Sequence, residues 1–362
     1  MEIAILTQPL GGNYGGVMQN WALQHVLRQM GHRPVTVDYW QMTNKRRRRM
    51  IWKHYKSLLF RRSKLASCPL PSKVEGWRAD VRRFVRKNIR LTSPMDVVPA
   101  GFWKEHRFDV YLVGSDQVWR PIYNNDIGAL GMMFLQPLEN FGNIRRIVYG
   151  ASFGTDEWEY GREDEAMAKR LVRCFDMVSV RERGGIELCE RHFGITPEHV
   201  LDPTLLVGRE EYAKLVPAKY RRKVPPGSAA VYILDCSPEK LAEVGRICAS
   251  VGRKPYFVGR KDETVPIPPV EEWLAALLEC DYMITDSFHG VAFSINFNLP
   301  FTLIVNSGRG AARFKSLLGH LGLEDRSDPD AAMRPIDWDS VNSVLEKERV
   351  KSIAYLRDAL MC

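Results

Sequence analysis

The chain has 362 residues, of which 45% are hydrophobic, and a formal net charge of +9 at pH 7. This length is enough for two ordinary domains, and no run of about 18 uncharged apolar residues predicts a membrane-spanning helix. The seven cysteines occur singly and without a C-x-x-C pair, which argues against a disulfide framework and against a zinc site. The first residues, MEIAILTQPL, lack the features of a signal peptide, so we expect a cytoplasmic protein.

Strand-like and helix-like segments alternate along the first half of the chain, which is typical of an α/β fold with parallel strands. The apolar run EIAILT is followed by a glycine-rich turn and then by apolar residues at helical spacing up to Gly31. The strands expected for a first sheet lie at 2–7, 34–39, 109–116, 146–152 and 176–182.

The positive charge is concentrated in an insertion at 41–90. From Lys45 to Arg90, seventeen Lys and Arg stand against two acids, giving +15, so the rest of the chain carries −6. Within it, the segment Lys45–Lys64 interleaves ten basic residues with apolar and aromatic ones. This pattern suits an anionic membrane surface, where each basic residue adds roughly 1 kcal/mol. A solvated loop is the alternative, and local charge of this kind favours a nucleic-acid partner least.

A basic, Pro- and Gly-rich stretch at 220–230 indicates part of a linker region, after which a second series of strands is expected. These strands lie at 229–235, 254–259, 281–285 and 301–305. We therefore predict two Rossmann-like domains facing across a cleft, 1–205 on the acceptor side and 206–362 on the donor side. The last helix is a candidate to pack back on the first domain. Ligands of such folds bind at the carboxyl ends of strands, so functional residues should follow strands.

The first turn, Gly11 to Gly16, joins a strand to a helix, where backbone N–H groups and the helix dipole favour an anion or another polar ligand. It matches neither the dinucleotide-binding fingerprint nor a phosphate-binding Walker loop. The alternative is that these glycines only serve tight turn geometry.

Three side chains after the strand at 109–116 suit a sugar. Asp116 and Gln117 can read hydroxyl groups, and the Trp119 indole can cover an apolar sugar face. The alternative is that Asp116 or Ser115 caps a helix while Trp119 lies in the core.

Arg181 follows the strand at 176–182 and could clamp a phosphate or a carboxylate through two hydrogen bonds. A structural ion pair between Arg181 and Glu182 is an equally good interpretation.

The stretch TDSFHG places Asp286, Ser287 and His289 between a strand and a helix. Asp286 or Ser287 is a suitable N-cap, which alone explains both residues. His289 would then lie in the first helical turn, facing the cleft. Arg309 and Arg313 follow the next strand, so these cations and His289 would form an anion site if they converge. A purely structural histidine is the alternative.

In six pieces, the sequence resembles the polysaccharide pyruvyl transferase family. They are GNYGGVMQNWALQHVL, VGSDQVW, YGASFG, VSVRERGG, VLDPTLLV and ITDSFHGVAFSINFNLPF, in family order. The resemblance implies two Rossmann-like domains arranged as in GT-B glycosyltransferases. It also implies transfer of pyruvate from phosphoenolpyruvate to a sugar as a ketal. Many members carry an arginine in the residues before the histidine, whereas this chain has Ser287-Phe288-His289.

The resemblance implies roles for the residues singled out above. His289 would be the general acid or would stabilise the departing phosphate, and Asp116 would be a candidate base on the acceptor hydroxyl. The expected donor-binding residues are Arg181, Ser287, His289, Arg309 and Arg313, and the expected acceptor-binding residues are Asn13, Tyr14, Gln117 and Trp119. The implied chemistry needs cations and proton transfer but no metal and no cofactor besides phosphoenolpyruvate as co-substrate.

Two other functions remain open at this point. One is a glycosyltransferase that uses a nucleotide sugar on the same fold, since a fold does not determine a function. The other is a non-catalytic binding protein of a polysaccharide-assembly system. The acceptor implied by the resemblance is a sugar of a bacterial surface polysaccharide, such as a capsule or exopolysaccharide, and a lipid-linked unit is one form of it.

Overall fold

The computed structural model describes residues 1–40, 47–49, 51–52, 55, 71–124, 128–259, 266–305 and 311–361. One predicted site residue, Arg309, lies outside the described residues, as does most of the basic segment Lys45–Lys64.

The chain forms two sheets in which all neighbouring strands are parallel. The first has the order β2-β1-β3-β4-β5-β6 and the second the order β10-β9-β7-β8. The first sheet comprises β1 (Glu2–Leu6), β2 (Arg33–Thr36), β3 (Val110–Asp116), β4 (Arg145–Ala151), β5 (Met177–Val180) and β6 (Glu198–His199). The second comprises β7 (Ser228–Tyr232), β8 (Lys254–Phe257), β9 (Tyr282–Thr285) and β10 (Phe301–Leu303). Every predicted strand is present, and only the two-residue β6 was not predicted.

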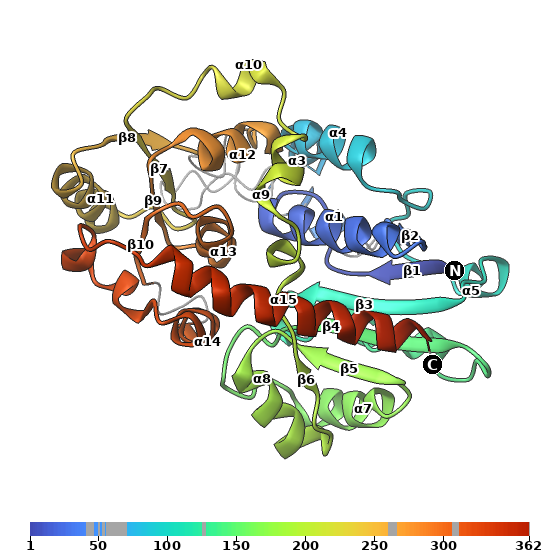
Figure 1. Cartoon of the computed structure of the whole chain (residues 1–362). Helices are drawn as coiled ribbons and strands as arrows, with labels where there is room; N and C mark the ends of the chain where they lie inside the picture. Colours follow the sequence, from blue (N-terminus) through green and yellow to red (C-terminus); the bar gives the residue numbers. More distant parts are fainter. Residues whose placement is uncertain are drawn as a thin grey trace.

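Helices surround both sheets, which lie next to each other in Figure 1. The longer helices are α1 (Tyr14–Gln29), α4 (Ala79–Asn88), α7 (Arg162–Val172), α11 (Pro238–Ser250), α12 (Val270–Glu279), α13 (Phe288–Asn296), α14 (Ala311–Leu321) and α15 (Trp338–Met361). The shorter ones are α3 (Pro71–Trp77), α5 (Phe102–Glu105), α6 (Ala129–Met132), α8 (Arg183–Leu188), α9 (Arg209–Ala213) and α10 (Ala218–Arg221). Single turns are η1 (Pro121–Tyr123), η2 (Gln136–Leu138), the π-helical η3 (Cys189–Phe193), η4 (Pro203–Leu205), η5 (Glu324–Ser327) and η6 (Pro329–Ala331).

Helix α15 begins beside the second sheet and runs back along the first (Figure 1). Its Ser352 hydroxyl accepts a hydrogen bond from the backbone of Leu201 at 2.9 Å, and its Tyr355 hydroxyl donates to the carbonyl of Val148 in β4 at 2.8 Å. The last helix therefore joins the end of the chain to the first sheet.

Helix α1 is buried along almost its whole length, because it lies between the first sheet and elements of the second half. Its polar residues are consequently used inside the protein. The Gln19 side chain accepts from the backbone N–H of Ser115 at 3.1 Å and donates to the Thr7 hydroxyl at 3.0 Å. These contacts fix the carboxyl ends of β1 and β3 relative to each other, where functional residues were expected.

The two halves share one apolar core. The largest cluster of buried side chains includes Val17 of α1 and Phe293 of α13. At the same seam, the Tyr14 ring stacks on Trp273, with centroids 5.4 Å apart, and its hydroxyl donates to the carbonyl of Pro268 at 2.8 Å. Because protein cores are close-packed, these contacts fix the position of the first sheet relative to the second.

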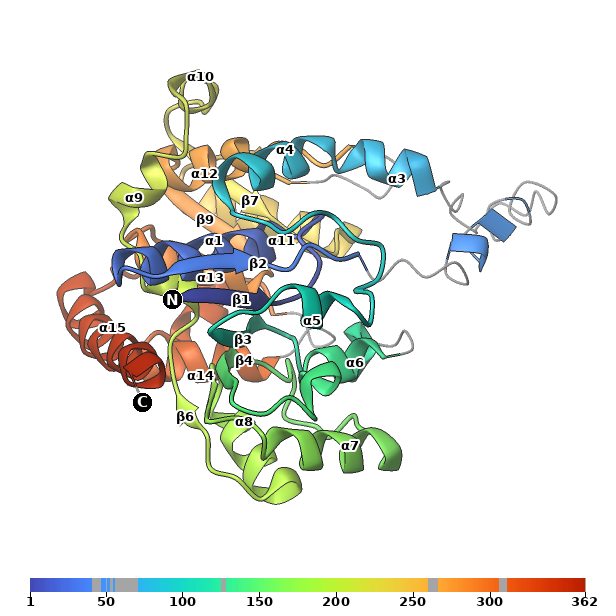
Figure 2. The ribbon, with the colours of Figure 1, turned by 90° about the vertical axis from the view of Figure 1, so that its right-hand side faces the viewer.

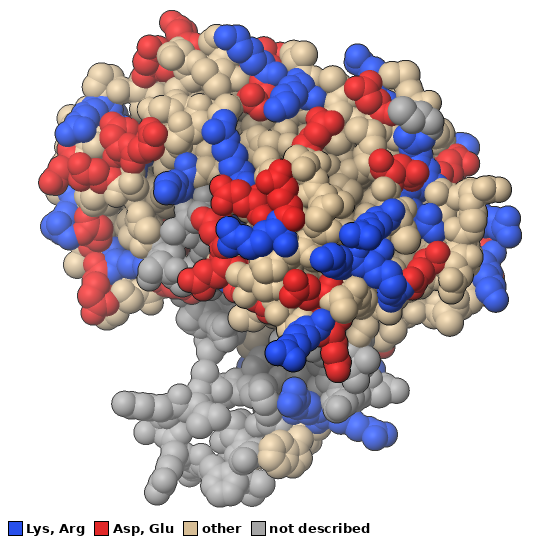
Figure 3. Space-filling view, turned by 90° about the horizontal axis from the view of Figure 1, so that it is seen from below, with Lys and Arg blue, Asp and Glu red and all other residues tan. Residues whose placement is uncertain are grey.

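On the outer surface, α3 and α4 follow each other along one edge of the molecule (Figure 2). On the face seen from below, acidic and basic side chains are interspersed (Figure 3). Within the described ranges, no helix combines the length and the apolarity needed to cross a bilayer.

Candidate functional site

A cavity of ≈ 260 Å³ lies where the carboxyl ends of strands from both sheets meet. The first half contributes the segments after β1 and β3, and the second half contributes those after β7 and β9 together with α14. Its lining consists of Gln8, Asn13, Asp116, Gln117, Tyr123, Leu234, Asp286, Ser287, Phe288, His289 and Arg313. This is the position at which doubly wound sheets usually bind ligands.

The turn after β1 brings the backbone of α1 against the His289 imidazole. Asn13 is the N-cap of α1, and its side-chain oxygen accepts from the backbone N–H of Gly15 at 3.0 Å. A Cβ atom at Gly15 would overlap the imidazole of His289. Glycine is therefore required here for close approach of a side chain, whereas the Asn13 amide oxygen is already engaged in the cap.

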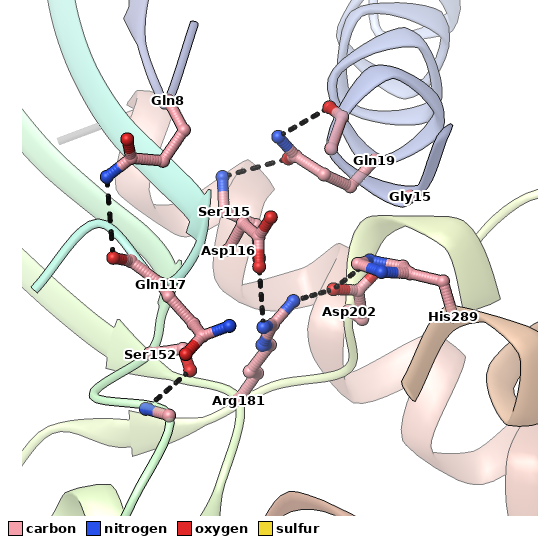
Figure 4. A network of polar contacts seen from close by, with 12 residues as sticks. Gln8, Gly15, Gln19, Ser115, Asp116, Gln117, Ser152, Arg181, Asp202 and His289 are labelled. Carbon is pink, nitrogen blue, oxygen red and sulfur yellow. Dashed lines mark hydrogen bonds and ion pairs between the residues drawn. The ribbon is translucent and has the colours of Figure 1, made fainter. Parts of the chain in front are cut away.

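Behind the cavity, Arg181 is held between two aspartates (Figure 4). Its Nη2 lies 2.8 Å from Asp116 Oδ1, and its Nη1 lies 2.5 Å from Asp202 Oδ2. Glu182 adds a third carboxylate at 3.9 Å from Nε. Burial alone would lower the pKa of Arg181, but these carboxylates raise it above its ordinary value. Arg181 is thus a permanent buried cation.

Asp116 and Asp202 are anionic because cationic groups lie beside them. Burial raises the pKa of a carboxyl group, but Arg181 and His289 overcome that effect at Asp116 and hold its pKa below the ordinary value. At Asp202, His289 and Arg181 likewise outweigh burial and lower the pKa further. Both carboxylates therefore stay ionised at neutral pH, which makes Asp116 a hydrogen-bond acceptor and only a weak base.

His289 lies in the first turn of α13, and its side chain points toward Asp202 (Figure 4). Its Nε2 is 3.8 Å from Asp202 Oδ2, which is an ion-pair distance and too long for a hydrogen bond. Among the described residues, this Nε2 atom has no hydrogen-bond partner although it is buried. Nε2 of His289 thus has the Asp202 carboxylate beside it but no hydrogen bond to it.

Arg313 of α14 reaches the same cavity, and its side chain is buried. Burial and repulsion by Arg181 lower the pKa of Arg313 to about 10. The Phe288 ring lies near both guanidiniums, with its centroid 4.7 Å from Cζ of Arg181 and 5.5 Å from Cζ of Arg313. The aromatic ring therefore has two cations beside it and stabilises each by a cation–π contact.

The sequence left open whether Asp286 or Ser287 caps helix α13, and the structure assigns the cap to Ser287. Ser287 is the N-cap of α13, since its hydroxyl accepts from the backbone N–H of Gly290 at 3.5 Å. Asp286 instead accepts from the backbone N–H of Leu234 at 2.7 Å and from Lys240 Nζ at 2.6 Å. Asp286 thereby fixes the loop after β7, which forms one wall of the cavity.

Some of the site residues predicted from the sequence line the cavity and others do not. Asn13, Asp116, Gln117, Ser287, His289 and Arg313 line it, whereas Tyr14, Trp119 and Arg181 do not.

The placement of Trp119 corrects the expectation that its indole faces a sugar. The side chain is fully buried, its N–H donates to the carbonyl of Met133 at 3.2 Å, and its ring stacks on Phe134 with centroids 5.0 Å apart. The backbone turns at Asp116, which has a φ of 76°, and Gln117 then faces the cavity. Trp119 consequently belongs to the core below the sheet.

Tyr14 and Arg181 are displaced from the cavity for other reasons. Tyr14 is engaged at the seam between the two halves, with its hydroxyl bonded to the carbonyl of Pro268. Arg181 has a side chain with no exposed surface and is enclosed by carboxylates. Direct contact of either residue with a ligand is therefore not available in this structure.

Two residues beside the His289 imidazole, Asp202 and Gly15, were not singled out from the sequence, and neither were Gln8, Tyr123 and Leu234 of the cavity lining. Asp202 stands in the piece VLDPTLLV, where its Oδ1 also accepts from the backbone N–H of Thr204 at 3.0 Å. Gly15 was considered only as part of the turn. An Asp-Pro pair after a short apolar run is the available signal for Asp202, but it equally marks an ordinary turn.

The comparisons with known proteins identify a family. The family model described as polysaccharide pyruvyl transferase matches residues 13–308. A comparison with curated proteins yields no match.

Solved structures show the fold. The Arabidopsis thaliana protein UGT89C1, crystallised with quercetin, has 10% identity and a TM-score of 0.50, and the match covers 98% of each chain. MurG of Acinetobacter baumannii has 12% identity and a TM-score of 0.48, with 99% of this chain and 98% of that chain covered. The α/β fold of GT-B type predicted from the sequence is confirmed. Because the family model spans most of the chain, this protein belongs to the polysaccharide pyruvyl transferase family and is a transferase.

Proposed function

We propose that this protein transfers the pyruvate unit of phosphoenolpyruvate to a pair of hydroxyl groups on a sugar, forming a ketal and releasing phosphate. Besides family membership, one observation carries the proposal. A single cavity between the two sheets contains the His289 imidazole, the Arg313 guanidinium and the N-terminus of α13. A cation, a proton donor and a helix N-terminus together suit a small phosphorylated acid.

The donor would bind on the side of the second sheet. Backbone N–H groups at the start of α13 and the guanidinium of Arg313 would donate hydrogen bonds to its phosphate or carboxylate. An anion there would also restore the pKa of Arg313, which burial and Arg181 lower to about 10. Many relatives carry an arginine before the histidine, and Arg313 is our candidate to bind the donor in place of that arginine. Arg309 remains a candidate for the same duty, but it lies outside the described residues.

Proton transfer would be the task of His289. Its Nε2, which lies 3.8 Å from the Asp202 carboxylate, would protonate the methylene carbon of phosphoenolpyruvate. One sugar hydroxyl would add to the cationic carbon and pass its proton to the imidazole of His289, which replaces the proton that was given to the methylene carbon. The second hydroxyl would then displace phosphate, which leaves with the remaining proton. Each bond formed to carbon is matched by a lost proton or by the departing phosphate.

The acceptor would approach from the first sheet. The Asp116 carboxylate has one oxygen on Arg181 and lines the cavity, so it can accept a hydrogen bond from the attacking hydroxyl. Its lowered pKa favours orientation of this hydroxyl over full removal of its proton. Amide groups of Gln8 and Gln117 lie on the same wall and suit further hydroxyls.

We place the reaction in the biosynthesis of a bacterial surface polysaccharide, at the cytoplasmic face of the membrane. The support is the composition of Lys45–Lys64, which suits contact with anionic lipids that surround a lipid-linked acceptor. Sedimentation with anionic vesicles, comparing the full chain with a chain that lacks this segment, tests the placement. Equal and salt-insensitive binding of both chains would contradict it.

The function is tested by supplying ¹⁴C-phosphoenolpyruvate with a panel of lipid-linked and free oligosaccharides and measuring phosphate release and label in the acceptor. We expect both to appear in equal amounts, and His289→Gln to lower the rate at least about 100-fold, the typical contribution of a general acid. Nucleotide sugars labelled in the sugar serve as the control. Label transferred from them and none from phosphoenolpyruvate would favour a glycosyltransferase instead.

A further inference from the structure

A second and larger cavity lies next to the first, on the side of the first sheet. It has a volume of ≈ 770 Å³, which falls within the usual range of about 300–1,000 Å³ for small-molecule pockets. The single turn η1 and helices α6 and α7 contribute to its walls, which consist of Pro121, Ile122, Asn124, Gly128, Leu130, Gly131, Gln136, Glu159, Asp164 and Met167.

Only a thin partition separates the two cavities. Gln8 lines the first cavity and Asn124 lines the second, and the Gln8 amide donates to Asn124 Oδ1 at 3.0 Å. The neighbouring residues alternate in the same way, because Tyr123 faces the first cavity whereas Ile122 faces the second. The two cavities thus share a wall, and a ligand in the larger cavity would lie beside the smaller one.

The small cavity does not have room for a sugar chain beside the donor. Its volume of ≈ 260 Å³ lies below the usual ligand-pocket range and is already committed to the donor in the function proposed above. Only the reacting hydroxyl groups of the acceptor need to enter it. The remainder of a sugar chain must therefore lie outside, and the larger cavity is the adjacent space.

The chemistry of the larger cavity selects among acceptors. The described residues in its lining include no Lys and no Arg, while Glu159 and Asp164 supply carboxylates and Gln136 supplies an amide. Such groups bind hydroxyls and repel anions. The Asn124 amide is engaged within the protein, since it donates to the carbonyls of Val118 and Arg120 and accepts from Gln8. Arg120 donates to both oxygens of Glu159, at 2.7 and 3.0 Å, so this carboxylate is held in one orientation.

Apolar side chains complete a surface suited to pyranose rings. Ile122, Leu130 and Met167 lie among the polar groups, and a sugar ring presents both hydroxyl edges and C–H faces. Gly131 leaves space for an amide, because a Cβ atom at this position would overlap the Gln136 side chain.

We propose that this cavity is the acceptor subsite and that it binds uncharged sugar units next to the one that receives the pyruvate. The inference rests on the function proposed above, but its own binding step does not require turnover. It assigns the acceptor to neutral oligosaccharides and excludes a uronic acid at the adjoining position.

Saturation-transfer NMR on the full chain tests this subsite without phosphoenolpyruvate. The probes are methyl β-D-galactopyranoside, methyl β-D-glucopyranoside and methyl α-D-mannopyranoside, with methyl β-D-glucuronoside as the anionic control. We expect transfer to at least one neutral glycoside and none to the glucuronoside. Transfer to none of the neutral glycosides, or equal transfer to the glucuronoside, would overturn the inference.

Substitutions locate the binding. We expect Asp164→Asn and Gln136→Ala each to weaken glycoside binding about 5- to 10-fold, the loss of one hydrogen bond, with the Kd for phosphoenolpyruvate unchanged. Glu163→Gln is the matched control, since it removes a carboxylate one residue away on α7 that does not line the cavity. Equal effects of Glu163→Gln and Asp164→Asn, or no effect of either cavity variant, would overturn the subsite.

The two proposals fail separately. If glycosides bind as expected but no label moves from phosphoenolpyruvate, the subsite stands and the proposed reaction falls. If label moves and the acceptor KM is the same in Asp164→Asn, in Gln136→Ala and in the unchanged chain, the reaction stands and the subsite falls.

Discussion

Two buried arginines flank the Phe288 ring, and their surroundings differ. Arg181, on the side of the first sheet, has carboxylates at 2.8 and 2.5 Å, and they raise its pKa. Arg313, on the side of the second sheet, lines the cavity, and its pKa is lowered to about 10. A charge that is compensated inside the protein maintains the fold. A charge whose ionised form is disfavoured inside the protein is better suited to an anionic ligand.

This comparison predicts a large loss of stability for Arg181→Met. The substitution leaves Asp116 and Asp202 buried without their cation, so we expect the free energy of unfolding in urea to fall by about 3–5 kcal/mol. Asp116→Asn and Asp202→Asn added to the same chain should recover part of the loss, because they remove the uncompensated charges. A loss below about 1 kcal/mol would show that Arg181 is not the structural cation of the pair.

Asp202→Asn tests the same cluster through pH. The folded pKa of Asp202 is lowered, so its ionised form contributes stability above the ordinary value of 3.8. That contribution is lost as the pH falls through the lowered pKa. We expect the variant to lose about 3 kcal/mol of unfolding free energy at pH 7 and less at pH 3. A difference that is independent of pH would contradict the assignment of charge to Asp202.

Arg313→Met, unlike Arg181→Met, should weaken ligand binding and not lower stability. The unfolded chain holds the Arg313 proton more tightly than the folded chain, so the charge costs stability at every pH below about 10. We expect unfolding free energy that is unchanged or higher, and phosphoenolpyruvate binding that is about 10- to 100-fold weaker by calorimetry. Arg313→Lys, which keeps the charge but not the planar fork, should fall between. Unaltered binding in Arg313→Met would remove this residue from the donor site.

The sequence predicted the sheets well because most of their strands are buried on both faces, and such strands appear as continuous apolar runs; β8 is the exposed exception among the predicted ones. In β1, for example, Ile3 and Ile5 face one cluster of core residues and Ala4 and Leu6 face the other. The two-residue β6 is too short to leave such a run. The position of functional residues after strands also followed from the parallel topology.

The sequence could not predict which side chains face the core and which face the cavity. Trp119 and Gln117 stand two residues apart, and only the backbone turn at Asp116 decides that one is in the core and the other in the cavity. Arg181 and Asp202 are 21 residues apart, so their ion pair depends on the return of the chain through β6. Which charged groups surround an arginine is a property of tertiary contacts, and no local pattern encodes it.

The smallest expected effect concerns the glycine that supports His289. A methyl group at Gly15 would overlap the imidazole, so Gly15→Ala should displace the ring from its position and lower kcat about 10-fold, with a modest loss of stability from overpacking. Gly16→Ala is the matched control, since its Cβ would lie 3.6 Å from Asp116 Oδ2, an ordinary contact. Alanine is favoured over glycine within a helix by about 1 kcal/mol, so this variant should keep its activity and be at least as stable. Equal activity of both variants would mean that the position of the imidazole against α1 is not needed for the reaction. The first half of the chain would then contribute to proton transfer only through the ion cluster around Arg181.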